Sequence, residues 1–227
     1  MSNTVHTYHA TATVAVNEAL ITLGQDVLAS SLAMNSTDPI IKKSAYIYDS
    51  ARKKVLRDHD WNFARREAIV NGCLAVCPGQ DEHARLPFSV PVPAHCIRVI
   101  ACMGAGRRGQ VEWSIIGKDI RSDEPIARIV YIYDVEDLDL WSPDAYRALV
   151  LRLAADLAKP ITGRINERNL QEQAYANALA EAKLSDARES NVSTDPWDEA
   201  SYADAMGGRP IDHERGMRRR DFLRGRW

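Results

Sequence analysis

Apolar residues recur at helical spacing in the first quarter of the chain. In residues 13–23 they fall at positions i, i+3, i+4 and i+7, and Gly24 follows, which predicts a short amphipathic helix. Asp38 followed by Pro39 is typical of a helix start, with a capping residue before a proline at the first helical position. The second helix is therefore predicted from Pro39 to about Asp58, with a buried face formed by Ile40, Ile41, Ala45, Ile47, Tyr48, Ala51 and Val55.

After Trp61 the pattern changes to short runs rich in Val, Ile and aromatic residues, separated by Pro or Gly. These runs predict strands at residues 69–76, 85–92, 95–103, 111–116 and 127–133. Pro91 lies in the second run, and because proline cannot donate to a central ladder, this run is predicted to be an edge strand or an extended loop. We expect a mobile hairpin tip from Gly104 to Gly109 and an acidic link over residues 134–140.

Helical spacing returns in the last third of the chain. Ser142-Pro143 repeats the cap-then-proline signal and starts a helix with a wide apolar face, which Pro160 is predicted to end. A more polar helix is predicted from Gly163 to about Glu189, with an apolar stripe at Leu170, Tyr175, Ala178, Leu179 and Ala182. The predicted class is α+β: a helical bundle core interrupted by a β-rich insert, with extended terminal arms. Its boundaries are 1–12 for the N-terminal arm, 13–64 and 141–189 for the core, 65–140 for the insert and 190–227 for the C-terminal docking arm.

The composition is that of an ordinary globular protein. Hydrophobic residues make up 45% of the chain and charged residues 26%, which argues against wholesale disorder, and a net charge of −2 excludes a polybasic coat for nucleic acid. No apolar run approaches the ~18 residues of a membrane span, and residues 1–15 lack the pattern of a secretory signal. We therefore expect a protein made in the cytoplasm, with reduced thiols at Cys73, Cys77, Cys96 and Cys102.

The near-neutral total hides a strong segregation of charge. Residues 42–66 carry a net charge of +5, residues 119–144 carry −6 and residues 209–227 carry +4. Opposite patches on one chain favour head-to-tail self-association, although each run alone also fits an ordinary solvated surface. The basic residues of the second helix are predicted to occupy its exposed side. The candidate inter-subunit or channel residues are Lys42, Lys43, Arg52, Lys53, Lys54, Arg57, Asp134, Glu136, Asp137 and Asp139.

The sequence offers no complete catalytic motif. The segment from Gly104 to Gly109 lacks the Lys-Ser/Thr ending of a phosphate loop, and there is no Gly-x-Ser-x-Gly elbow. Asp58-His59-Asp60 fits an acid/base site, but a helix-terminal histidine that interacts with the helix dipole is the simpler interpretation. Cys73-x-x-x-Cys77 with Cys96, Cys102 or His95 departs from zinc-knuckle spacing. We expect no enzyme activity, no cofactor and no metal.

Several segments resemble, in order, those of bacteriophage head-to-tail adaptors, a family also called tail tubular protein A or gatekeeper-type connectors. The segment from Ala15 to Gly24 resembles the opening AVN-x-x-L helix of that family, and Ala45 to Phe63 resembles its second helix, which ends in W-x-F. The later matches are Leu86-Pro87 with Pro93 to Val99 for the LP…R-[VI] strand, Ile129 to Asp134 for the I-x-Y-[IV] strand, and Tyr146 to Lys159 for an Ala/Leu-rich helix.

The resemblance implies a structural virion protein. Such proteins form a ring, typically of twelve subunits, that joins the portal of a short-tailed phage to the tail nozzle and continues the DNA channel. The implied partners are further copies of the chain, the portal protein, the nozzle protein and phage DNA that passes without sequence-specific binding, with no membrane. The implied location is the tail neck of the virion, after assembly in the host cytoplasm. We expect the second helix and the helix of residues 146–159 to build the ring wall and the acidic link to face the channel.

The C-terminal arm is too aromatic for a pure spacer, and we expect it to grip the portal or an adjacent subunit. Arginine forks and tryptophans are common interface anchors. The candidate contact residues are therefore Trp197, Arg215, Arg218, Arg219, Arg220, Phe222, Arg224 and Trp227.

Two other classes of function stay open. A DNA-binding packaging accessory would use the basic second helix, with Tyr48, Trp61 and Phe63 stacking on bases, although such aromatics more often belong to a core. Its duplex affinity would fall steeply with salt. A tail-associated cell-wall hydrolase would need a carboxylate pair, and no second element singles one out within residues 134–139.

Overall fold

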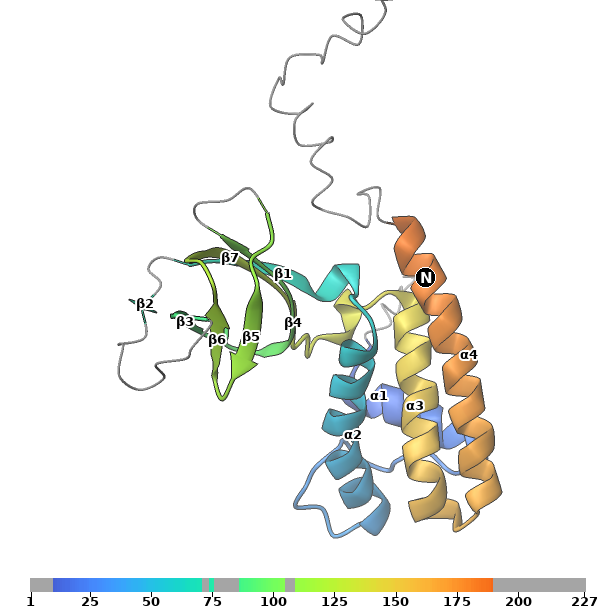
Figure 1. The fold of residues 1–227 in the computed structure, drawn as a ribbon. Coiled ribbons are helices and arrows are strands. Elements are labelled where there is room, and N and C mark those ends of the chain that lie inside the picture. Colours follow the sequence, from blue (N-terminus) through green and yellow to red (C-terminus); the bar gives the residue numbers. More distant parts are fainter. Residues whose placement is uncertain (1–9, 71–73, 76–85, 105–108, 190–227) are drawn as a thin grey trace, which may run out of the picture. The chain divides into compact units, whose positions relative to one another are not determined.

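The computed structural model of the protein describes residues 10–70, 74–75, 86–104 and 109–189. Over these residues the chain has an α+β fold, with α-helices before and after a run of short antiparallel strands (Figure 1). The predicted fold class is therefore confirmed.

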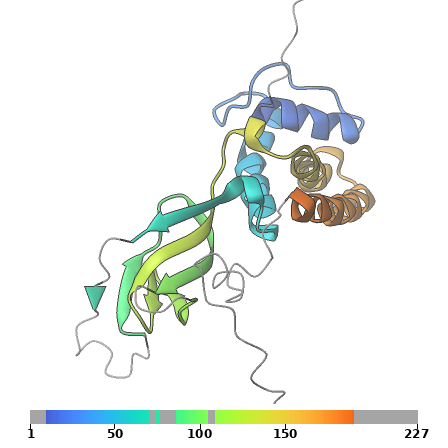
Figure 2. The same cartoon turned by 90° about the horizontal axis from the view of Figure 1, so that it is seen from above.

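The helices occupy the predicted stretches. Helices α1 (Ala12–Thr22) and α2 (Pro39–Asp58) precede the strands, and α3 (Pro143–Thr162) and α4 (Ile165–Glu189) follow them. Two 3-10 helices, η1 and η2, span Asn62–Ala64 and Leu138–Leu140. Helix α3 packs against the other three helices, and α1 lies across the bundle that α2, α3 and α4 form (Figures 1 and 2). None of the described helices is long and apolar enough to cross a membrane.

The predicted capping signals start two of these helices. The Asp38 carboxylate accepts a hydrogen bond from the Ile40 N–H at 2.7 Å, and the Ser142 hydroxyl accepts one from the Ala145 N–H at 3.4 Å. Each cap is followed by proline at the first helical position, where its missing N–H costs nothing. These local signals explain why the observed starts agree with the predicted ones.

The prediction that Pro160 ends α3 is wrong, because the helix continues to Thr162. Proline removes one hydrogen bond within a helix, but here the loss falls in the exposed last turn. The helix ends instead at Gly163, whose φ of +69° is the left-handed conformation that favours glycine. The Gly163 N–H donates to the Lys159 carbonyl at 3.1 Å and completes the cap.

The main hydrophobic core lies among the helices and is centred on α3. Leu149, Leu153 and Leu157 of α3 are completely buried there. Two predicted core positions are wrong, since Ile40 is 36% exposed and Leu170 is 59% exposed. One residue rotates a side chain by about 100° around a helix. The neighbour of Ile40 in α2, Ile41, is buried as predicted, whereas the neighbour of Leu170 in α4, Gln171, is buried although it was not predicted to be.

The strands form two antiparallel sheets with a second, smaller core. In the three-stranded sheet, the order is β1 (Arg65–Ile69), β7 (Ile126–Tyr133) and β4 (Cys96–Gly104). In the four-stranded sheet, the order is β2 (Leu74–Ala75), β3 (Phe88–Pro91), β6 (Asp119–Ser122) and β5 (Trp113–Ile116). The buried residues of the second core are Val90, Val99, Cys102, Val111, Ile120, Ile126 and Ile129.

Three strand predictions need correction. The bounds of the predicted strand at residues 69–76 are wrong, since β1 covers Arg65–Ile69 and β2 covers only Leu74–Ala75. Strand β6 was not predicted because its short, mostly polar sequence buries only Ile120 and Ser122. The prediction of an edge position for the run with Pro91 is also wrong, since β3 lies between β2 and β6. Proline is tolerated there because β2 pairs only with the first two residues of β3. Residues 105–108 of the predicted hairpin tip lie outside the described residues.

The core assignment predicts a clear contrast between two leucines. Leu153→Ala should lower the free energy of unfolding by about 2–5 kcal/mol, because it leaves a cavity in the main core. Leu170→Ala makes the same chemical change at an exposed position of α4 and should change it by no more than about 0.5 kcal/mol. Urea unfolding followed by circular dichroism measures both, and equal losses would contradict the assignment.

Candidate interaction site

Five of the predicted basic residues lie on the exposed side of α2. Lys42, Lys43, Lys53, Lys54 and Arg57 recur there at helical spacing, and we call this surface the cationic face of α2. Lys53 pairs with Asp49 at 2.7 Å and Lys54 pairs with Asp58. Lys42 and Arg57 form no ion pair with any residue that the structure describes. The unpaired positive charge on this face is therefore concentrated near the two ends of the helix.

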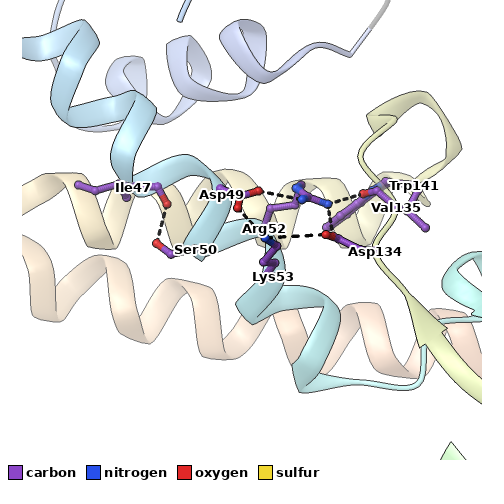
Figure 3. A network of polar contacts seen from close by, with 8 residues as sticks. All are labelled: Ile47, Asp49, Ser50, Arg52, Lys53, Asp134, Val135 and Trp141. Carbon is purple, nitrogen blue, oxygen red and sulfur yellow. Dashed lines mark hydrogen bonds and ion pairs between the residues drawn. The ribbon is translucent and has the colours of Figure 1, made fainter. Parts of the chain in front are cut away.

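Arg52 does not belong to this face, and the prediction that it is exposed is wrong. Its side chain is only 2% exposed and lies between α2 and the end of β7 (Figure 3). The guanidinium donates to the Asp134 carboxylate, to the Val135 carbonyl at 2.9 Å and to the Asp49 carboxylate at 2.8 Å. Asp134 was predicted to be a channel or inter-subunit residue, but it is 8% exposed and is neutralised within the chain.

Hydrogen bonds favour the charged forms of Arg52 and Asp49. Burial opposes the charge of Arg52, but hydrogen bonds to Asp134 and Asp49 outweigh it and raise the arginine pKa. Hydrogen bonds from Lys53 and then Arg52 lower the pKa of the Asp49 carboxyl. Burial raises the pKa of Tyr48 to about 12, so its hydroxyl stays neutral at ordinary pH. The result is a charged guanidinium held between two carboxylates.

The other three candidate carboxylates of the acidic link are exposed. Glu136, Asp137 and Asp139 all lie on the surface. Asp137 caps η2 by accepting a hydrogen bond from the Asp139 N–H at 3.0 Å, and Asp139 in turn accepts one from the Ala10 N–H at 2.7 Å. The link is therefore ordered by its own side chains while these three carboxylates face outward.

An open depression of about 450 Å³ lies where the C-terminal half of α2 faces the start of β4. We call it the Arg57 groove, and its lining residues are Ser50, Lys53, Lys54, Arg57, His95, Cys96, Ile97 and Asp134. A second depression, of about 280 Å³, shares His95 and Asp134 with it. Its other lining residues are Arg66, Tyr133, Val135, Glu136, Asp137 and Leu140. The basic helix and the acidic link thus meet at adjoining hollows of one chain.

His95 shapes the edge between the two depressions. Its φ of +56° is in the left-handed region, which is uncommon for a residue other than glycine. Its carbonyl accepts a hydrogen bond from the Asp134 N–H at 2.8 Å, and its ring centroid lies 5.8 Å from that of Tyr133. Asp134 is therefore held through its backbone by this turn and through its side chain by Arg52. Sequence reasoning considered His95 only as a metal ligand.

The Asp58-His59-Asp60 segment does not converge on one acid/base site. Asp58 accepts a hydrogen bond from the Tyr175 hydroxyl at 2.7 Å, and Asp60 pairs with Arg98 of β4. His59 Nε2 lies 3.1 Å from Oδ2 of Asp186, which is a buried residue of α4 and also accepts from the Asn62 N–H at 3.1 Å. The three side chains have three different partners, so the segment fastens the end of α2 to α4 and to β4.

The aromatics that a DNA-binding protein would use are largely enclosed. Trp61 is completely buried, and its indole N–H donates to the Val55 carbonyl at 2.8 Å. Tyr48 and Phe63 are half-buried and pack against the main core. Tyr46, which the sequence analysis did not single out, is 61% exposed on α2.

The remaining candidates are the cysteines and the arm. Cys96 and Cys102 are free thiols, and burial raises both pKa values, that of Cys102 to about 12. Within the described ranges, no group of three His, Cys, Asp or Glu side chains could hold a metal ion. Cys73, Cys77 and the eight arm candidates between Trp197 and Trp227 lie outside those ranges.

No protein-family model matches the sequence, and no curated protein matches it.

The buried ion pair predicts a strongly non-additive set of variants. Asp134→Ala leaves the Arg52 guanidinium buried without its carboxylate and should lower the free energy of unfolding by about 3–5 kcal/mol. The double variant Arg52→Met/Asp134→Leu removes both charges and should recover most of that loss. Lys53→Met, which breaks an exposed pair, should cost at most about 1 kcal/mol. Additive losses in urea unfolding would contradict the proposed geometry.

Proposed function

We propose that this chain is a head-to-tail adaptor of a short-tailed bacteriophage, a structural protein whose ring joins the portal to the tail nozzle. The observation that carries the proposal is where the family-like segments lie. Apart from Leu86-Pro87, they fall mainly in α1, α2, β4, β7 and α3, and each of these elements contributes residues to the main core or packs against it. The resemblance therefore concerns residues that specify the fold rather than scattered surface positions.

The distribution of exposed charge supports contacts between copies. The cationic face of α2 offers a positive surface, while the exposed carboxylates of the acidic link offer a negative one. Heterologous contacts between unlike surfaces generate rings when the rotation closes. We assign Glu136, Asp137 and Asp139 to the channel, where repulsion lets DNA slide, and we exclude Asp134 because Arg52 neutralises it. The basic end of the arm, residues 209–227, is proposed to bind the portal.

The portal contact is tested with a matched pair of triple variants. Arg218→Ala/Arg219→Ala/Arg220→Ala should abolish co-sedimentation of the full chain with cognate portal rings, because arginine forks anchor the interface. The control, Lys118→Ala/Arg164→Ala/Arg188→Ala, removes three exposed cations elsewhere and should co-sediment like the unmodified protein. If the unmodified protein does not co-sediment with the portal and instead binds duplex DNA with an affinity that falls steeply with salt, the chain is a DNA-binding accessory.

The channel assignment predicts an effect on DNA ejection. In phage carrying Glu136→Gln/Asp137→Asn/Asp139→Asn, ejection should be slower, because amides remove the negative charge that repels phosphates. The amide at position 137 keeps an oxygen that can still cap η2. Phage carrying Asp119→Asn/Glu181→Gln/Glu189→Gln, with three exposed carboxylates neutralised elsewhere, should eject at the normal rate. Equal rates in the two variants would rule out the assignment.

A further inference from the structure

The Arg57 groove combines an unpaired cation with an apolar wall. Of its cations, Lys53 is paired with Asp49 at 2.7 Å and lies 3.9 Å from Asp134, and Lys54 is paired with Asp58. Arg57 is exposed and forms no ion pair in the described part of the chain. The opposite wall is provided by β4, where Cys96 and Ile97 are half-buried. The groove therefore suits a ligand that brings one or a few carboxylates next to an apolar group.

The same lining disfavours a nucleic-acid backbone. Duplex DNA carries a negative charge about every 1.7 Å along its axis and requires a track of available cations. Here Asp134 lies in the groove wall, and Asp49, which is half exposed, neutralises Lys53. A polyanion would meet these carboxylates together with the cations. A short peptide with spaced acidic residues avoids that repulsion.

The chain itself contains a segment of this chemistry. Between residues 190 and 208 there are four acidic residues and no lysine or arginine. Asp195, Asp198 and Glu199 flank Trp197, so the segment offers carboxylates for Arg57 and a large aromatic group for the wall formed by Ile97. The following basic stretch, residues 209–227, has the opposite charge and does not complement the groove.

We propose that the Arg57 groove is the docking site for the acidic segment, residues 195–204, of a second copy of this chain. This contact adds detail to the proposed adaptor function, and the place of the contact in a ring rests on that function. The arm then has two roles: its acidic half links neighbouring copies through the groove, and its basic half remains available for the portal. The contact is heterologous, since a segment of one copy enters a groove of the next, and it can repeat around a ring.

Complementary variants of the full chain test this contact without the portal. The donor variant, Arg57→Glu, keeps its acidic segment but loses the groove cation. The receptor variant keeps the groove but has a segment without its charges and tryptophan; its substitutions are Asp195→Asn/Trp197→Ala/Asp198→Asn/Glu199→Gln. Sedimentation velocity should show each variant alone as a monomer and their mixture as a 1:1 complex. Arg164→Glu makes the same charge change at an exposed position outside the groove, so as donor control it should self-associate like the unmodified chain.

A labelled peptide of residues 193–206 separates the alternatives. It should bind the receptor variant, and adding Arg57→Glu to that variant should weaken binding by about tenfold or more, whereas adding Arg164→Glu should not. An unmodified chain that stays monomeric while the mixture forms the 1:1 complex would mean that the segment docks on its own copy, which overturns the proposal. Peptide binding without a complex in the mixture would mean that the segment does not reach a second copy, which overturns it as well. No peptide binding, or displacement of the peptide by duplex DNA at equal concentration, would also overturn it. Because the portal is absent, failure here is distinct from failure of the adaptor function.

Discussion

A buried arginine fixes how the basic helix meets the end of the longest strand pair. Arg52 of α2 forms an ion pair with Asp134, which directly follows β7, and donates to the Val135 carbonyl at 2.9 Å. The same carbonyl accepts from the Trp141 indole N–H at 3.4 Å, just before α3 (Figure 3). A buried guanidinium is destabilising unless its donors are satisfied, so this charge requires the acidic link to lie against α2.

The consequences of that constraint extend to the surface. With Asp134 held from one side by Arg52, its N–H is held from the other by the left-handed turn at His95. This arrangement places the Asp134 carboxylate in the wall of the Arg57 groove, whereas Glu136 and Asp137 line the adjoining depression. A second buried carboxylate, Asp186 of α4, contacts His59 and accepts a hydrogen bond from the Asn62 N–H. These contacts fasten the end of α2 to α4. Two buried carboxylates, Asp134 and Asp186, thus fix where α2 lies against the acidic link and against α4.

Local signals predicted much of the helical part. The pairs Asp38-Pro39 and Ser142-Pro143 carry their own capping chemistry, so the starts of α2 and α3 follow from a few neighbouring residues. Strand β6 lacked such a signal, because four residues of mixed polarity become a strand only through pairing with β3 and β5. The predicted end of α3 at Pro160 was wrong for a similar reason, since the position of a proline within the helix decides how much it destabilises the helix.

The groove could not be predicted in the same way. Periodicity assigns a charged residue to the surface, and nothing near Arg52 in the sequence shows that its main partner lies 82 residues further along the chain. The left-handed backbone at His95 likewise depends on the pairing of β4 with β7. The sequence predicted the two charged segments that form the site, a basic helix and an acidic link. Tertiary contacts decided which of those charges neutralise each other and which remain exposed.

The most direct test of the adaptor account is the mass of the complex that the protein forms with its cognate portal, measured by native mass spectrometry. The account predicts that the portal ring gains many copies of the 25.4 kDa chain at once, one complete ring, with few partly filled species. A portal whose mass is unchanged, or which gains one or two copies without saturating at a closed ring, would contradict it.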